Sequence, residues 1–393
     1  MGALTLTGVG SDNSIRTGAS GSVGLGVAAV EGQVAFTTFV IPNGTLATAT
    51  GNPATQTNQA TLVGPNYMLV LRDTRLWEGG TGSWATGGNW QQGIGGATGA
   101  ATFTSGSGAT SLPSVLTFTG TGGTATNDVA DTVNVGGLNF APGAGSYTLA
   151  GTPFTLGLNA NIRNLSTTSQ AISADIAVAG SQWIYGETNS LLTISGGISG
   201  AGTKLTKLGA GGLVLSAANT FDGGIDVTAG RLLVDGSLAS GVSLASGALL
   251  GGSGSLPSLS VATGGLLAFD PASAGLTLPS GNNVTLTSPA SFGVASLRTL
   301  SGGAINWGSV APNTYSLLAG TTTSFSGIGN FGENNALVDG DRSMYFESSG
   351  TGLQLVVVPE PAGLALAGLG LAAAAWACRK KMGPRDAALG RSR

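Results

Sequence analysis

Apolar residues alternate with polar ones along most of the chain, and in one stretch the alternating lines recur at a fixed interval. The lines GIDVTAGRLLV from Gly224, GVSLASGALLG from Gly241 and SLSVATGGLLA from Ser258 align residue for residue. The aligned sets, with 17 residues between successive members, are Ile225, Val242 and Leu259; Val227, Leu244 and Val261; Gly230, Gly247 and Gly264; and Leu232, Leu249 and Leu266. Each line predicts two short strands and two corners, and because one repeat cannot bury its apolar face alone, we expect the repeats to stack.

The same alternation extends to both sides of the 17-residue repeat. From Asp131, the lines TVNVGGLNF, SYTLAGTPFTLG, AISADIAVAG and LLTISGGISG each place apolar residues on one face and polar residues on the other. After Asp270 the spacing loosens, and NVTLTS, AINWGSV and SMYFESSGTGLQLVVV predict terminal coils or a small closing sheet. We therefore expect an all-β repeat region over residues 131–357.

Composition distinguishes this pattern from disorder. The chain has 69 Gly and only 8% charged residues, but it is 41% hydrophobic with a net charge of −3, whereas disordered chains combine low hydrophobicity with high net charge. Glycine suits the corners of a β-rich solenoid because it adopts the positive φ that tight turns need. The few Lys and Arg in the body argue against nucleic acid as a partner.

Two segments precede the repeats. Residues 1–75 are rich in Gly, Ser, Thr and Ala and predict strands among loops. The opening MGALTLTGVGSDNSIR lacks the basic residues and apolar run of a signal peptide, so we expect either a start further upstream or an export signal of another kind. Residues 76–130 include Trp77, Trp84 and Trp90 among glycines. These side chains predict either a platform that stacks on sugar rings or a hydrophobic cap over the first coil of a solenoid.

The C-terminal residues 358–393 have a different pattern. Pro359-Glu360-Pro361 is followed by an uncharged run of 17 residues from Ala362 to Cys378 and then by the basic residues Arg379, Lys380 and Lys381. The run is long enough to span a bilayer, although a buried soluble helix is the alternative. Because Lys and Arg are retained on the cytoplasmic side, we expect a transmembrane helix that places the β body outside.

The segment LTKLGAGGLVLSAANTFDGGIDVTAGRLLV, from Leu205 to Val234, resembles the autotransporter-associated β-strand repeat. The family pattern is K-x-G-x-G-x-L-x-L, then N-x-[YF]-x-G, then a strand ending in A-G-x-L. Ala217 and Ile225 depart from it, where the family usually has Gly and Thr. The matching positions are Lys207, Gly209, Gly211, Leu213, Leu215, Asn219, Phe221, Gly223, Val227, Gly230 and Leu232. The resemblance implies a right-handed parallel β-helix.

The tail resembles a PEP-CTERM sorting signal, which consists of a Pro-Glu-Pro motif, an apolar run and a basic cluster in that order. The resemblance implies recognition by an exosortase, a membrane processing enzyme, after transient anchoring in the inner membrane. The chain departs from the family pattern because residues 382–393 follow the basic cluster.

Residue types that carry catalysis are scarce. The chain has no histidine, which excludes histidine-dependent triads and imidazole metal sites, and no Gly-Lys dipeptide, which excludes a P-loop. Asp222 and Asp226 are the candidates for a pair of carboxylates that cleaves polysaccharides, but Asp226 aligns with Ser243 and Ser260 rather than with further acids. Asp339, Asp341 and Glu347 predict a solvated turn rather than a calcium loop. We expect no cofactor and no metal.

The sequence therefore predicts an exported, non-enzymatic β-helix protein of the cell envelope, cell surface or extracellular polysaccharide matrix, with polysaccharide as a possible partner. The alternative is a polysaccharide-active β-helix lyase or hydrolase that uses surface carboxylates. A classical autotransporter passenger is disfavoured because the chain ends in one apolar run rather than in the alternating strands of a barrel.

Overall fold

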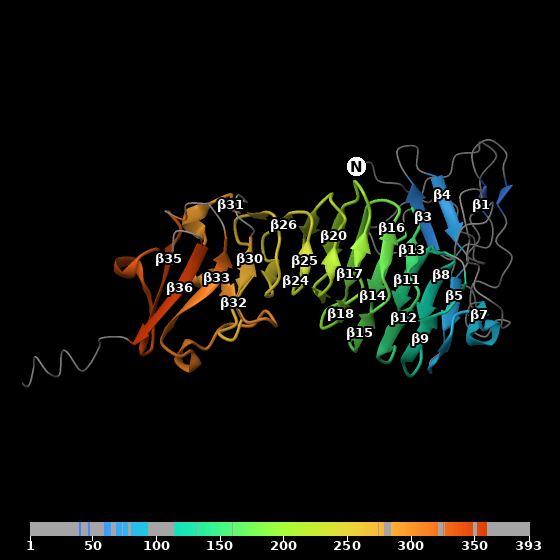
Figure 1. Ribbon diagram of the computed structural model, residues 1–393, viewed down its shortest axis with the longest axis horizontal. Helices are drawn as coiled ribbons and strands as arrows, with labels where there is room; N and C mark the ends of the chain where they lie inside the picture. The colour runs from blue at the N-terminus through green and yellow to red at the C-terminus, as the bar shows by residue number, and fades with distance from the viewer. Residues whose placement is uncertain are drawn as a thin grey trace, which may run out of the picture.

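The computed structural model forms one elongated β body in which the chain winds from the Trp-rich segment at one end to the closing strands at the other (Figure 1). The structure describes residues 39–40, 46–47, 59–63, 68–72, 74–77, 80–92, 114–130, 132–158, 160–273, 275–278, 284–320, 325, 327–348 and 352–359. Within these ranges the only helical elements are short 3-10 turns, namely η1 (Gly87–Asn89), η2 (Pro289–Ser291), η3 (Val294–Ser296), η4 (Trp307–Ser309) and η5 (Glu333–Asn335).

Two long parallel sheets form most of the body, and each turn of the chain adds one strand to each of them. The first sheet contains β5 (Thr74–Trp77), β8 (Val115–Phe118), β11 (Gly137–Phe140), β14 (Ile162–Asn164), β17 (Gln182–Gly186), β20 (Leu205–Leu208), β23 (Ile225–Val227), β26 (Val242–Leu244), β28 (Leu259–Val261) and β31 (Val284–Leu286), with β7 (Trp90–Gln92) added antiparallel to β5. The second sheet contains β6 (Gly82–Ser83), β9 (Gly123–Asn127), β12 (Tyr147–Gly151), β15 (Ser169–Ile172), β18 (Leu191–Ile194), β21 (Gly212–Leu215), β24 (Arg231–Val234), β27 (Leu249–Gly251), β29 (Leu266–Ala268) and β32 (Leu297–Arg298). This confirms the expected parallel β-solenoid. Ten parallel strands at the usual spacing give a stack of about 43 Å.

A third face joins the two long sheets and is built from shorter strands. Its four-stranded part is β10 (Val133–Val135), β13 (Phe154–Leu156), β16 (Ile176–Val178) and β19 (Ile198–Ser199). It continues with β22 (Ala218–Asn219) paired to β25 (Ser237–Leu238), and then through single bridges from Ser237 to Ser255 and from Ser255 to Thr277 in β30 (Leu276–Thr277). The solenoid is thus enclosed on three sides.

The alternation in the sequence determines which side chains fill the interior. In β23, Ile225 and Val227 are buried while Asp226 between them faces outward, and β26 and β28 repeat this arrangement in register. The continuous interior column from Ile225 through Val242 and Leu259 has the spacing that the sequence predicts. Stacked aliphatic columns of this kind supply the burial that one coil lacks.

One part of the predicted register is wrong. Leu232 pairs with Leu250 rather than with Leu249, although Leu249 does pair with Leu266 as expected. The corner between β26 and β27 holds one residue more than the corner between β23 and β24, and Ala248, 0% exposed, fills the added space. Because side-chain direction alternates along a strand, this one-residue step keeps Leu232 and Leu250 in the core and places Leu249 on the opposite face of the strand, where it is also buried, with 3% of its surface exposed.

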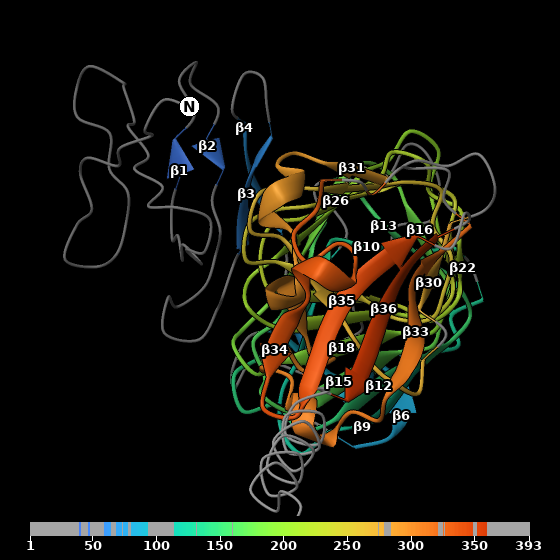
Figure 2. The same ribbon diagram turned by 90° about the vertical axis from the view of Figure 1, so that its left-hand side faces the viewer.

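A five-stranded sheet closes the C-terminal end of the solenoid. Its order is β30, β33 (Asn313–Ala319), β36 (Gly352–Pro359), β35 (Arg342–Ser348) and β34 (Leu337–Asp339), and Figure 2 shows it lying across the end of the body. Since β30 pairs parallel with β33 while β33, β36, β35 and β34 pair antiparallel, the closing sheet is a direct extension of the third face. For the residues after Asp270, the sequence predicted terminal coils or a closing sheet, and the structure has both. The strands β31 and β32 belong to a last coil of the long sheets, and β33 to β36 form the closing sheet.

The segment 1–75 lies mostly outside the described residues. Within it, β3 (Gln59–Val63) and β4 (Met68–Arg72) form an antiparallel pair, as do β1 (Phe39–Val40) and β2 (Leu46–Ala47). The predicted transmembrane run from Ala362 to Cys378 also lies outside the described residues. Among the residues that are described, no helix has the length and apolar character needed to cross a membrane.

Candidate functional site

The predicted sorting motif begins at the last residue of the last described strand. Pro359 is the last residue of β36 and is exposed, and its register partner is Arg342 at the start of β35. A proline has no N–H to extend the ladder of hydrogen bonds, so pairing stops there for a physical reason. Val357, two residues before Pro359, is 1% exposed and belongs to the core of the closing sheet. Glu360, Pro361 and the basic residues Arg379, Lys380 and Lys381 lie outside the described residues.

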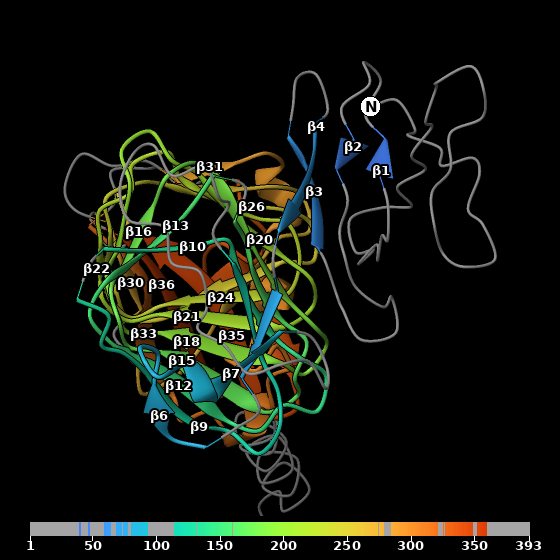
Figure 3. The ribbon, with the colours of Figure 1, turned by 90° about the vertical axis from the view of Figure 1, so that its right-hand side faces the viewer.

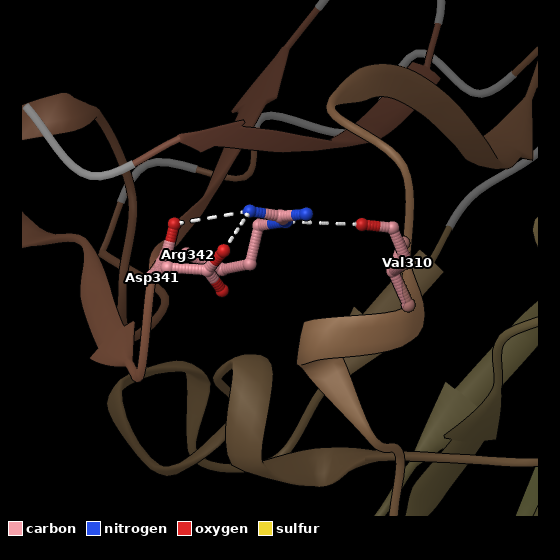
Figure 4. A network of polar contacts seen from close by, with 3 residues as sticks. All are labelled: Val310, Asp341 and Arg342. Atoms are coloured by element: carbon pink, nitrogen blue, oxygen red, sulfur yellow. Dashed lines mark hydrogen bonds and ion pairs between the residues drawn. The ribbon is translucent and has the colours of Figure 1, made fainter.

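Arg342 fixes the end of the closing sheet opposite Pro359. Its Nε donates to the carbonyl oxygen of Val310 at 3.1 Å, and one of its terminal nitrogens contacts Oδ2 of Asp341 at 2.7 Å (Figure 4). Asp341 is largely exposed, so this ion pair contributes little on its own. The contact with Val310 connects β35 to the loop that precedes β33. It thereby fixes the position of β35, the strand that pairs with Pro359.

The acidic cluster predicted around Asp341 is not assembled in space. Asp339 and Asp341 flank the turn between β34 and β35, whereas Glu347 lies near the far end of β35, opposite Gln354. Within the described residues, no group of three or more metal-ligating side chains forms. The two aspartates thus lie at an exposed surface turn, and Glu347 lies apart from them.

Lys207 of the repeat motif is buried inside the solenoid, with 1% of its surface exposed. It occupies an interior column in which the neighbouring coils have Ile184 and Val227. Its Nζ donates to the carbonyl oxygens of Leu208 and Gly209, both at 2.8 Å, and of Ala229 at 3.3 Å. Burial, followed by the nearby charge of Arg231, lowers the pKa of Lys207 to about 8. The lysine therefore binds the backbone of two coils rather than an external ligand.

Asn219 plays the corresponding role on the third face. Its Oδ1 accepts the N–H of Ile198 at 3.1 Å, and its Nδ2 donates to the carbonyl oxygens of Ala217 at 2.8 Å and Ser237 at 3.2 Å. These partners belong to three successive coils. An asparagine in this position supplies a donor and an acceptor where the two-residue strands leave backbone groups unpaired.

The remaining motif positions shape the backbone or fill the core. Gly209 and Gly230 have φ of +71° and +70°, and a Cβ on Gly223 would lie 2.4 Å from the carbonyl oxygen of Thr203. A Cβ on Gly211 would lie 2.5 Å from the carbonyl oxygen of Glu187. The apolar positions of the motif are all buried and are Leu213, Leu215, Phe221, Val227 and Leu232.

Other polar residues also bond to the backbone inside the solenoid, although no motif in the sequence marks them. Gln170 and Gln182 occupy interior columns whose neighbours are Leu192 and Leu205, and Asn164 caps Ser166 while donating to Leu191. Gln170 accepts the N–H of Tyr147 at 2.9 Å, and Gln182 donates to the carbonyl oxygen of Gly157 at 2.8 Å. The sequence signal for such an inward-facing polar residue is that the aligned position of the next coil holds an apolar residue, such as Leu192 for Gln170 and Leu205 for Gln182.

The two candidate carboxylates each have a partner on the preceding coil. Asp226 makes an ion pair with Lys204 on the outer face, and it lies in register with Ser243, as the spacing predicts. Asp222, at the preceding corner, accepts the backbone N–H of Gly202 through Oδ1. Each carboxylate thus contacts a neighbouring coil of the solenoid.

The three tryptophans of the lead-in are buried at the N-terminal end of the solenoid, where β5 and β7 cover the first coil (Figure 3). Trp77 packs edge-on against Trp90 with ring centroids 4.9 Å apart, and Trp84 packs on Trp90 at 6.0 Å. The indole nitrogen of Trp90 donates to the carbonyl oxygen of Trp84 at 3.0 Å. With 0–1% of their surface exposed, these rings have no free face for a sugar.

Two family models match parts of the chain. The passenger-associated-transport-repeat matches residues 205–234, and the PEP-CTERM protein-sorting motif matches residues 357–381. No curated protein and no solved structure matches the chain. The repeat match covers β20 to β24, which includes Lys207 and Asn219, and the sorting match begins inside β36.

Proposed function

We propose that this chain, an autotransporter-associated β-strand repeat protein with a PEP-CTERM sorting signal, is a structural or adhesive rod of the cell envelope or the extracellular polysaccharide matrix. The sorting motif implies export that depends on an exosortase, and the repeat fits an exported β-solenoid. The role of the body as a spacer or display surface is our inference.

The observation that carries this proposal is the use of the polar motif residues inside the solenoid. Lys207 and Asn219 direct their side chains at backbone groups of adjacent coils, and both are buried. A binding or catalytic repeat would present such polar residues to solvent. In this chain, Lys207 and Asn219 instead connect one coil to the next. A repeat built in this way supports the function of a scaffold.

The alternative of a polysaccharide-cleaving enzyme has less support. Glycoside hydrolysis needs an acid and a second carboxylate free to act on the same bond. Asp226 is ion-paired with Lys204, and Asp222 accepts a backbone N–H, so both candidates have structural partners. We therefore propose a non-enzymatic function.

The tail supports a specific route to the surface. We propose that residues 358–393 anchor the chain transiently in the inner membrane and that an exosortase removes or replaces the tail there. The motif begins at Pro359, the last residue of a strand that pairs with β35, so the enzyme would meet it directly beside the closing sheet. No flexible spacer is needed in this arrangement.

The test is cell fractionation of the tagged full chain in a host with and without its exosortase, followed by mass analysis of the mature C-terminus. With the enzyme, we expect the chain in the envelope or outside the cell, ending near Pro359. A triple alanine variant of Pro359, Glu360 and Pro361 should keep its tail, whereas the control Pro289→Ala, in a distant surface turn, should be processed normally. A chain that keeps its tail and stays in the cytoplasm of the complete host would contradict the proposal.

A further inference from the structure

The outer face of the first long sheet has a column of polar and aromatic side chains that the repeat does not use internally. Strand pairing places its members in register over successive coils. In each strand, the residues directly before and after the column member face inward. We call it the outer column, and its members are Trp183, Thr206, Asp226, Ser243, Ser260 and Thr285.

An open groove of about 290 Å³ lies along this column at the corner between the third face and the first sheet. Its polar lining comes from Asp222, Ser243, Ser258, Ser260 and Thr285. Gly223, Gly224 and Gly241 also line it at the corner, where a Cβ on Gly224 would have the carbonyl oxygen of Gly241 at 3.4 Å. The groove crosses four coils and is parallel to the solenoid axis.

The charges beside the groove favour an uncharged ligand. Lys204 and Asp226 neutralise each other through their ion pair. Asp222 is the remaining charged residue that lines the groove, and its negative charge disfavours an anionic chain. Serine and threonine hydroxyls both donate and accept hydrogen bonds, which suits a ligand whose own surface consists of hydroxyl groups.

Trp183 extends the same column two strands beyond the groove. Its backbone N–H is held by Oδ1 of Asn161 at 3.0 Å, while Gln182 and Ile184 on either side are buried, so its ring is on the outer face and remains partly exposed. Tryptophan has a large apolar face with a polar edge, which is the combination that packs on a sugar ring. This tryptophan, unlike the three of the lead-in, is available for contact.

We propose that the outer column and its groove bind a neutral polysaccharide chain that lies parallel to the solenoid axis. From Trp183 to Thr285 the column spans five strand spacings, which is about 24 Å and accommodates several sugar units. The hydroxyls of Ser243, Ser260 and Thr285 bind the chain in the groove, and Trp183 stacks on a sugar further along. This inference rests on the proposed function, because it names the matrix component to which the rod would adhere.

The test is affinity electrophoresis of the purified full chain in gels containing a soluble neutral glucan (laminarin), a neutral galactomannan or the anionic polymer alginate. We expect at least one neutral polymer to retard the protein and alginate to leave it unaffected. Trp183→Ala should weaken the retardation about 10-fold or more, because it removes the aromatic side chain of the column. The double variant Ser243→Val and Ser260→Val keeps β-forming residues and should weaken binding as well.

The matched control is Thr193→Val, on the outer face of the second sheet beside Ala171 and Val214, which should bind like the parent. Thermal unfolding of each variant checks that the fold is retained. Failure of both neutral polymers to retard the parent, equal retardation of all variants, or binding of alginate alone would overturn the inference. Export and tail processing measured on the same chain would then show whether the proposed function still stands.

Discussion

The Nζ of Lys207 donates a hydrogen bond of 3.3 Å to the carbonyl oxygen of Ala229, which lies on the next coil of the solenoid. The same nitrogen contacts two carbonyl oxygens of its own coil. A buried amine that links two coils in this way has consequences for stability that depend on its protonation.

Lys207 should make the protein more stable as pH rises from 8 to 10. Its pKa is lowered from 10.5 to about 8 in the folded state by burial, so between these values the unfolded chain binds more protons and stability increases with pH. The gain is at most about 3 kcal/mol. Urea unfolding gives the free energy of unfolding of the parent and of Lys207→Met. The value for the parent minus the value for the variant should be more positive at pH 10 than at pH 7.

Two comparisons isolate this effect. Lys204→Met, which removes a lysine with a side chain 45% exposed, is the control for the loss of one positive charge. Measurements should end at pH 10, because burial raises the pKa of Tyr147 from 10.0 to about 12 and stability is then lost as pH rises above 10. Equal pH dependence in Lys207→Met and the parent would show that Lys207 is not the group responsible.

Asn219→Ala should destabilise the protein by about 2–3 kcal/mol, because it leaves the N–H of Ile198 and two carbonyl oxygens without their partner in a buried corner. Chemical denaturation gives the free energy of unfolding. The control Asn313→Ala, where the exposed side chain accepts the N–H of its neighbour Thr314, should cost less than about 0.5 kcal/mol. Similar costs for the two variants would contradict a cross-coil role for Asn219.

Trp90→Ala should destabilise the N-terminal end of the rod by about 3–5 kcal/mol, since it empties the centre of the tryptophan cluster. Because each coil contacts only its neighbours, amide exchange should increase first in β5 and β8 and later in β28. Trp307→Ala, beside Phe269 near the other end, is the control and should leave β8 protected. Uniform loss of protection in both variants would argue against local capping.

A chain that stops after Pro359 should unfold at the same temperature as the full chain, because every strand of the closing sheet is then complete. A chain that stops after Ser348 lacks β36, which lies between β33 and β35, and should expose the closing sheet to protease. Limited proteolysis and thermal unfolding of the two truncations measure this difference. A large loss of stability in the chain that stops after Pro359 would show that the body depends on the tail.

Sequence periodicity predicted the stacked strands well where both corners kept a constant length. It failed at Leu232, which was expected to pair with Leu249 and pairs with Leu250 instead. The added corner residue leaves the apolar pattern intact and moves only the register. Lys207 and Asn219 were recognised as motif residues, but their inward direction was not, since a polar side chain in an alternating line is normally assigned to the outer face. The link between the third face and the closing sheet was also beyond prediction, because it depends on single bridges at Ser255 and Thr277.

The position of β36 also determines how the rod would respond to mechanical force. Hydrogen bonds in antiparallel pairs lie perpendicular to the strands, and β36 has such pairs on both sides along its length. A pull on the chain at Pro359 acts along the strand and therefore shears many of these bonds together instead of opening them one after another. A load applied at this end therefore reaches the antiparallel pairs of the closing sheet before it reaches β30 and the other two-residue strands of the third face.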